Sequence, residues 1–163
     1  ARLDLSPEEV VRRLNVIFHA NSPQGVFITL AYASYELETR RFTYLRAGHN
    51  SCLVRRTNGT VERLMPPGMI IGFDPGPRFD AGLGSVCITL APGDSVLLYT
   101  DGASEAMNPR GEEFTEGRLE KVFADCDGDA ASAIKSIETA VLDFCDGERQ
   151  RDDLTLLVVK VTE

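Results

Sequence analysis

Short β-rich runs joined by tight turns fill much of the first hundred residues, and this pattern constrains the fold more than any other feature. The clearest turn is Asn58-Gly59, the strongest short hairpin signal, between the runs 51–56 and 60–64. Tight turns join antiparallel strands, whereas parallel strands need a long crossover. The sequence therefore predicts antiparallel sheets. The other strand-like runs are 26–37, 41–47, 85–90, 95–100 and 154–161.

Three further segments allow structural predictions. An Ala-Pro-Gly-Asp turn at 91–94 joins the runs 85–90 and 95–100. The terminal run 154–161 is almost uninterruptedly apolar, so we expect it in the interior of a sheet. Residues 65–78 contain four prolines and three glycines, which predicts a loop without regular pairing whose apolar centre covers part of the molecule.

Helical signals appear at the start of the chain and again after the strands. Ser6, Pro7 and Glu9 have the pattern of a capping box with proline at the first helical position, and apolar residues then recur at helical spacing to about Ala20. Helices and antiparallel strands in this order predict an α+β layered domain with the helices packed outside the sheets. Two later segments also have helical periodicity: 114–124 and 130–145.

Composition excludes several classes of protein. The 163 residues, 43% of them hydrophobic, suffice for one domain with a real core. The apolar runs are strand-sized, so we expect no membrane span, and the first residues lack the apolar core of a signal peptide, which favours the cytoplasm. A net charge of -8 argues against a nucleic-acid or anionic-membrane surface. The cysteines have no metal-binding spacing and are expected to be reduced core residues: Cys52, Cys87, Cys126 and Cys145.

Acidic residues stand at the ends of two apolar runs. Asp101 directly follows the run 95–100, and Asp152 and Asp153 precede the terminal run. If these strands are antiparallel neighbours, the acids face the same edge of the sheet, which would suit a hard cation such as Mg²⁺ or Mn²⁺. Acids at strand ends are also commonly solvated turn residues or helix caps, so chemistry alone leaves both interpretations open.

Several segments, in order, resemble motifs of the metal-dependent (protein phosphatase 2C-like) serine/threonine phosphatases. The resemblance is to the bacterial branch of the stage II sporulation phosphatase and the sigma-factor regulatory phosphatases. It covers essentially the whole chain, and it implies an antiparallel β-sandwich flanked by helices. The segments that carry it are Phe27–Leu30, Tyr44–Asn50, Pro92–Gly102, Glu105-Ala106, Gly111–Phe114 and Asp152–Leu157.

The resemblance also implies a reaction. Asp101 matches the aspartate of the family's Thr-Asp-Gly motif and Asp152 the first acid of its Asp-Asp-x-Thr motif, and both would be catalytic metal ligands. Asp153 and Gly102 would lie beside them without binding the metal. Two Mn²⁺ or Mg²⁺ ions would activate a water that hydrolyses phosphoserine or phosphothreonine. The implied substrate is a phosphorylated signalling protein, an anti-sigma-factor antagonist of a bacterial stress response.

One departure bears on that interpretation. The family has an Asp-x-x-Gly-x-Gly segment, with an aspartate that bridges the two metals, upstream of the first helix found here, and the printed sequence has none. We therefore expect residues 1–163 to be a single phosphatase-like domain that is incomplete at its N-terminus, the C-terminal two-thirds of the catalytic domain. We favour truncation over natural degeneracy, because both Asp101 and Asp152 are present.

Such a fragment would bind metal poorly by itself, and its missing strands would leave an exposed sheet edge prone to self-association. An upstream sensor or receiver domain is compatible with the sequence. The alternative function is a non-catalytic phosphatase-like module that binds a partner protein in a signalling pathway.

Two further positions receive structural interpretations. His49 could be taken for a general acid, but we expect it to serve in structural hydrogen bonding. Gly48 and Gly102 are expected at backbone conformations that a side chain would forbid.

Overall fold

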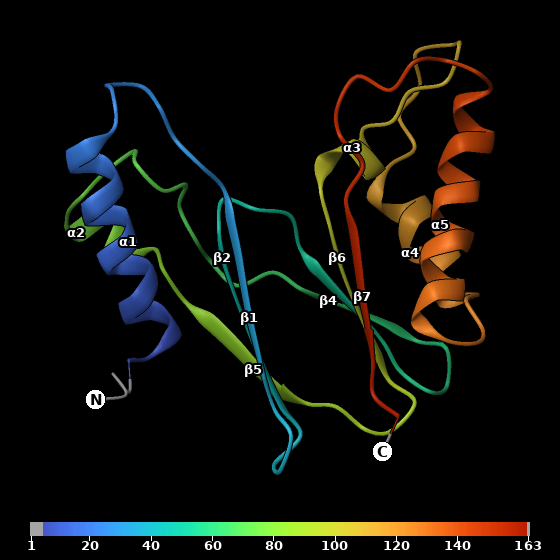
Figure 1. Ribbon diagram of the computed structural model, residues 1–163, viewed down its shortest axis with the longest axis horizontal. Coiled ribbons are helices and arrows are strands. Elements are labelled where there is room, and N and C mark those ends of the chain that lie inside the picture. Colours follow the sequence, from blue (N-terminus) through green and yellow to red (C-terminus); the bar gives the residue numbers. More distant parts are fainter. Residues whose placement is uncertain (1–4, 163) are drawn as a thin grey trace. The chain divides into compact units, whose positions relative to one another are not determined.

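The computed structural model describes residues 5–162, which form five helices and seven strands in two compact units (Figure 1). Unit 1 contains the residues up to Ser51 together with Leu64–Thr89, and unit 2 contains Cys52–Arg63 together with the residues from Leu90 onward. Each unit has its own antiparallel sheet and its own apolar core. No described helix is both long enough and apolar enough to cross a membrane.

Unit 1 is a three-stranded sheet with helix α1 packed against it. The predicted capping box is confirmed, because Ser6 Oγ accepts from Glu9 N and the Glu9 carboxylate accepts from Ser6 N, both at 3.2 Å. The predicted hairpin is also confirmed, although its first strand is shorter than expected. The elements are α1 (Pro7–Asn21) and, in the sheet order β1-β2-β5, the strands β1 (Leu30–Glu36), β2 (Arg41–Ala47) and β5 (Ser85–Thr89).

The proline-rich segment 65–78 supplies part of the unit 1 core. Ile71 is fully buried, and its main chain exchanges two hydrogen bonds with Ile28, at 3.0 and 3.1 Å. The apolar centre of the segment therefore covers the core, as predicted. The predicted position of the loop's end, at residue 78, was wrong, because Pro77 begins the short helix α2 (Pro77–Ala81), which buries Phe79. Proline suits a first helical position, and five residues are too few for a periodic signal.

Unit 2 is a four-stranded sheet in the order β4-β3-β6-β7. The predicted hairpin at Asn58-Gly59 is confirmed: Gly59 has a φ of 84°, and its N–H donates to Arg56 O at 2.9 Å. β6 pairs antiparallel with both β3 and β7. The strands are β3 (Cys52–Arg55), β4 (Val61–Leu64), β6 (Ser95–Tyr99) and β7 (Leu156–Lys160).

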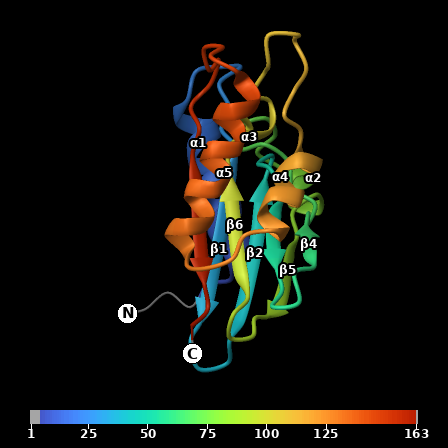
Figure 2. The ribbon, with the colours of Figure 1, turned by 90° about the vertical axis from the view of Figure 1, so that its right-hand side faces the viewer.

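Two helices cover one face of the unit 2 sheet. α4 (Glu116–Ala124) and α5 (Ala130–Cys145) occur where helical periodicity predicted them, and Figure 2 shows α5 in front of β6 and β7. Their apolar sides pack on the sheet in one core cluster, with Phe123 and Ile137 fully buried. A short helix, α3 (Asp101–Ser104), follows β6 directly.

One expectation about the strands was wrong. β7 is an edge strand of the described sheet rather than an interior one, and its Leu157 and Val159 side chains are 50% and 43% exposed. The predicted turn at 91–94 is confirmed, and the strands it joins do not pair with each other, because β5 belongs to the unit 1 sheet and β6 to the unit 2 sheet. A run of apolar residues or a tight turn indicates the local conformation of the chain, but it does not indicate which strands pair with each other.

The carboxylate of Asp94 explains why the turn 91–94 leads into unit 2. Asp94 is 2% exposed, and its oxygens accept from the Arg56 guanidinium at 2.8 Å and from the N–H groups of Thr57 and Ala91 at 3.1 and 2.9 Å. Gly93 N also donates to Val161 O at 2.7 Å. The turn is therefore tied to the β3–β4 hairpin and to the end of β7.

All four cysteines are free thiols, as predicted, but only three are in the core. Cys87 was expected to be buried and is exposed. It lies on β5, where exposed and half-buried positions alternate with the two-residue period of a strand, so its side chain falls on the outer face.

Candidate functional site

The structure brings the segments of Asp101 and Asp152 together at one end of the unit 2 sheet. β6 ends at Tyr99 and β7 begins at Leu156, and these two residues are directly opposite in the antiparallel register. Pairing continues beyond the strands, because Thr100 N donates to Thr155 O at 3.1 Å. The residue after β6 and those before β7 therefore meet at the same sheet edge.

The carboxylates of Asp101 and Asp152 are exposed and only partly engaged. Asp101 is the first residue of α3, and its Oδ1 accepts from Gly102 N at 3.1 Å. Asp152 Oδ1 accepts from Asp153 N at 2.7 Å. In each carboxylate, Oδ1 thus accepts a hydrogen bond from the N–H of the following residue, and Oδ2 remains available to a ligand.

Thr100 holds the two segments together through its side chain. Its Oγ1 donates to Asp153 O and accepts from Thr155 N, both at 2.9 Å. Asp153 and Thr155 are therefore both bonded to the end of β6 by one hydroxyl group, and Thr155 is bonded by the main chain as well. The sequence analysis missed this residue, although a hydroxyl side chain immediately before the acid of a Thr-Asp-Gly motif was a signal that could have suggested it.

Gly102 is needed for space rather than for its backbone conformation. A Cβ at Gly102 would lie 2.5 Å from the carbonyl oxygen of Asp153 and 2.8 Å from its carbonyl carbon. The φ angle of Gly102 is in the ordinary helical range, so the expected special conformation was wrong here. At Gly48 it is confirmed, with a φ of 72°.

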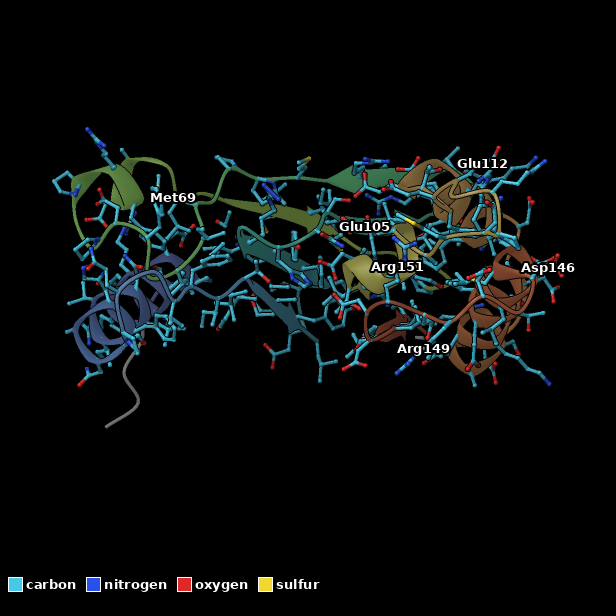
Figure 3. The ribbon with its side chains drawn as sticks, turned by 90° about the horizontal axis from the view of Figure 1, so that it is seen from above. Met69, Glu105, Glu112, Asp146, Arg149 and Arg151 are labelled. Atoms are coloured by element: carbon cyan, nitrogen blue, oxygen red, sulfur yellow. The ribbon has the colours of Figure 1, made fainter. Side chains whose placement is uncertain are left out.

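Charged side chains surround this sheet edge. Arg149 and Arg151 are exposed and precede Asp152, and the structure describes no ion pair for either. Seen from above, Arg151 and Glu105 lie at α3, whereas Arg149 lies farther out (Figure 3). Asp153 is exposed too, and its contacts with Thr100 are made by its main chain. The edge therefore carries both negative and unpaired positive charge.

The donor set fits a hard divalent cation in part. Asp101 and Asp152 offer carboxylate oxygens that are open to solvent, which Mg²⁺ and Mn²⁺ accept while they retain several waters. Within residues 5–162, no group of three or more His, Cys, Asp or Glu side chains could hold a metal ion by itself. A cation here would need water or further ligands beside the two aspartates.

His49 belongs to unit 1, in the segment after β2. Its Nδ1 lies 3.2 Å from Thr29 Oγ1, and its carbonyl oxygen accepts from the Arg46 guanidinium. These contacts agree with the hydrogen-bonding role expected from the sequence. Asp101 and Asp152 belong to unit 2.

Comparison with known proteins adds a family and several relatives. A model of the family "Stage II sporulation protein E (SpoIIE)" matches residues 1–162. Phosphoserine phosphatase RsbU of Bacillus subtilis is 28% identical over 163 residues, which cover 96% of this chain and 45% of that protein. Protein IcfG of Synechocystis is 25% identical over 135 residues, 83% of this chain and 21% of that protein. The chain thus spans less than half the length of these curated relatives.

Solved structures share the fold. The SiaA PP2C domain of Pseudomonas aeruginosa has a TM-score of 0.80 at 18% identity, over 94% of this chain and 60% of that one. The manganese-presoaked phosphatase domain of SpoIIE from Bacillus subtilis has a TM-score of 0.70 at 17% identity, over 98% and 68%. RsbX in complex with magnesium has a TM-score of 0.62 at 15% identity, over 96% and 65%. These similarities confirm an α+β fold of the phosphatase 2C type.

Proposed function

The chain belongs to the stage II sporulation protein E family, and we propose on that premise that the protein containing it is a metal-dependent phosphatase acting on phosphoserine or phosphothreonine. The family match confirms the resemblance found in the sequence motifs. One structural observation carries the proposal: the antiparallel register of β6 and β7 brings Asp101 and Asp152 to the same sheet edge, each with a carboxylate oxygen open to a ligand.

In this proposal Asp101 and Asp152 hold Mn²⁺ or Mg²⁺. The metals named for the SpoIIE and RsbX structures support that choice. A pair of such ions lowers the pKa of a bound water and neutralises charge on phosphoryl oxygens, so the protein need supply no nucleophile. Asp101 and Asp152 orient their free oxygens because the other oxygen of each is held by a main-chain N–H group.

The phosphoryl group of the substrate needs positive charge from the protein as well. Arg149 and Arg151 are the cations that precede Asp152, and their guanidinium groups are free of described ion pairs. A guanidinium can donate two parallel hydrogen bonds to a phosphate, which suits it to this task better than a point charge. Arg151, which lies at α3, is the better placed of the two (Figure 3).

The substrate follows from the relatives and remains part of the proposal. RsbU is named a phosphoserine phosphatase, which supports a phosphorylated regulatory protein such as an anti-sigma-factor antagonist. The protein would then act in the cytoplasm in bacterial signal transduction, with a sensor or receiver domain as its input. Self-association through the open edge of β7 also remains a prediction.

The test is hydrolysis of a generic phosphomonoester and of a phosphoserine peptide by the native full-length protein, with and without Mn²⁺. Asp101→Asn and Asp152→Asn should each abolish the metal-dependent rate. Asp143→Asn, an exposed acid on α5, is the matched control and should leave the rate unchanged. A folded full-length protein without Mn²⁺-dependent activity would reject the proposal and favour the alternative, a non-catalytic module that binds a partner protein.

A further inference from the structure

We infer that Thr100 is a positioning residue whose hydroxyl group sets the separation of Asp101 and Asp152, and thereby the affinity of this edge for a divalent cation. The inference rests on the proposed function, because it assigns a role toward the metal that the two aspartates would bind. Thr100 itself donates no ligand in this arrangement. It acts through the segment 153–155, which it holds against the end of β6.

The hydroxyl group of Thr100 makes two hydrogen bonds at the same time. Thr100 Oγ1 donates its proton to Asp153 O and accepts the N–H of Thr155, each at 2.9 Å. A hydroxyl is both donor and acceptor, so serine can reproduce this pair of bonds and valine can reproduce neither. The bonds fall on both sides of Leu154, so they fix where the segment that begins at Asp152 leaves the sheet.

Gly102 supports the same arrangement from the other side of Asp101. The carbonyl of Asp153 occupies the space where a Cβ of residue 102 would be, so the two segments are in direct contact. Asp101 is thus flanked by two residues that touch the Asp153 main chain, Thr100 through a hydrogen bond and Gly102 through close packing. Moving the segment 153–155 would therefore shift Asp152, the residue next to it, relative to Asp101.

The hydroxyl can be tested separately from strand pairing. The main-chain bond from Thr100 N to Thr155 O does not involve the side chain, so it remains in any non-proline variant. Valine has the shape and the β-branched backbone preference of threonine. Thr100→Val therefore removes the two side-chain bonds and leaves the register of β6 and β7 in place.

The experiment measures Mn²⁺ affinity by calorimetry in the native full-length protein, with urea unfolding of each variant alongside. Groups that orient metal ligands typically contribute 10- to 100-fold to metal affinity, so Thr100→Val should weaken Mn²⁺ binding by about 10-fold or more. Thr100→Ser should restore affinity close to that of the unaltered protein. Thr139→Val, on the exposed side of α5, is the control and should have no effect.

A second measurement separates this inference from the proposed function. Amide hydrogen exchange at Thr155, in protein without metal, should be faster in Thr100→Val than in the unaltered protein and normal in Thr100→Ser. Unchanged Mn²⁺ affinity in Thr100→Val, in a protein that binds Mn²⁺ and hydrolyses phosphomonoesters, overturns the inference and leaves the proposed function intact. Absence of Mn²⁺ binding in the unaltered protein rejects the proposed function and with it a metal-positioning role, whatever the exchange at Thr155 shows.

Discussion

Replacing Gly102 by alanine should destabilise the protein, although residue 102 lies in helix α3 and alanine has a higher helix propensity than glycine. A Cβ at this position would lie 2.5 Å from Asp153 O, 2.8 Å from Asp153 C and 3.2 Å from Leu154 N, and all three atoms belong to the main chain. Ordinary contact begins at 3.4 Å, so the Asp153 carbonyl would have to retreat by roughly 1 Å. That movement strains the hydrogen bonds of Thr100 to the same segment.

The expected size of the effect follows from opposing contributions. Overpacking of this kind costs about 1–3 kcal/mol. Alanine regains at most about 1 kcal/mol of helix propensity over glycine, and less in a helix of one turn such as α3. The free energy of unfolding should therefore fall by about 1–2 kcal/mol, which lowers the melting temperature by roughly 2–8 °C in a domain of this size.

Gly117 provides the matched control. It lies in α4, has no positive φ, and a Cβ there would meet only Thr115 Oγ1, at 4.0 Å. Gly117→Ala should therefore raise the free energy of unfolding by about 0.5–1 kcal/mol. Urea unfolding followed by circular dichroism measures both variants. If Gly102→Ala is as stable as Gly117→Ala, the close contact with Asp153 is not a constraint and the reasoning fails.

Three further predictions concern other parts of the chain. Asp94→Ala should lower the free energy of unfolding by about 3 kcal/mol in urea titrations, because it removes the buried acceptor of the Arg56 guanidinium and of the Thr57 and Ala91 N–H groups; a loss below about 1 kcal/mol would contradict this. The hydrogen bond from Arg41 lowers the pKa of the exposed Cys87 thiol, so alkylation followed by mass spectrometry should label Cys87 before the three buried cysteines. In Arg41→Gln that labelling should begin only at higher pH, and an unchanged pH profile would argue against the bond. Arg151→Ala should raise KM for a phosphoserine peptide with little change in Mn²⁺ affinity, whereas an unaltered KM would remove this arginine from phosphate recognition.

Much of the local structure was predictable from the sequence, because the relevant signals are local. The capping box at Ser6 and Glu9 predicts where α1 begins, and the Asn58-Gly59 pair predicts the position of a hairpin turn. The periodicity of 114–124 and 130–145 identified two helices almost residue by residue. The order of the motifs around Asp101 and Asp152 was enough to recognise the family.

Other features depend on which strands become neighbours, and local patterns do not contain that information. The turn 91–94 is a tight turn, yet it connects strands of two different sheets, and its Asp94 is bound by Arg56 of unit 2. β7 has the composition of an interior strand and lies at an edge of the described sheet. Cys87 could not be assigned to the outer face before the pairing of β5 with β2 was known.

For the candidate site, too, some features were predictable from the sequence and others depended on the tertiary structure. The sequence by itself determined that Asp101 and Asp152 each stand at the end of a strand, because the apolar runs beside them are continuous. Only the tertiary structure decided that those strands are antiparallel partners, that Thr100 bonds to the segment before β7, and that Gly102 is required for space. These contacts join residues more than fifty positions apart, and their formation depends on the packing of the whole sheet.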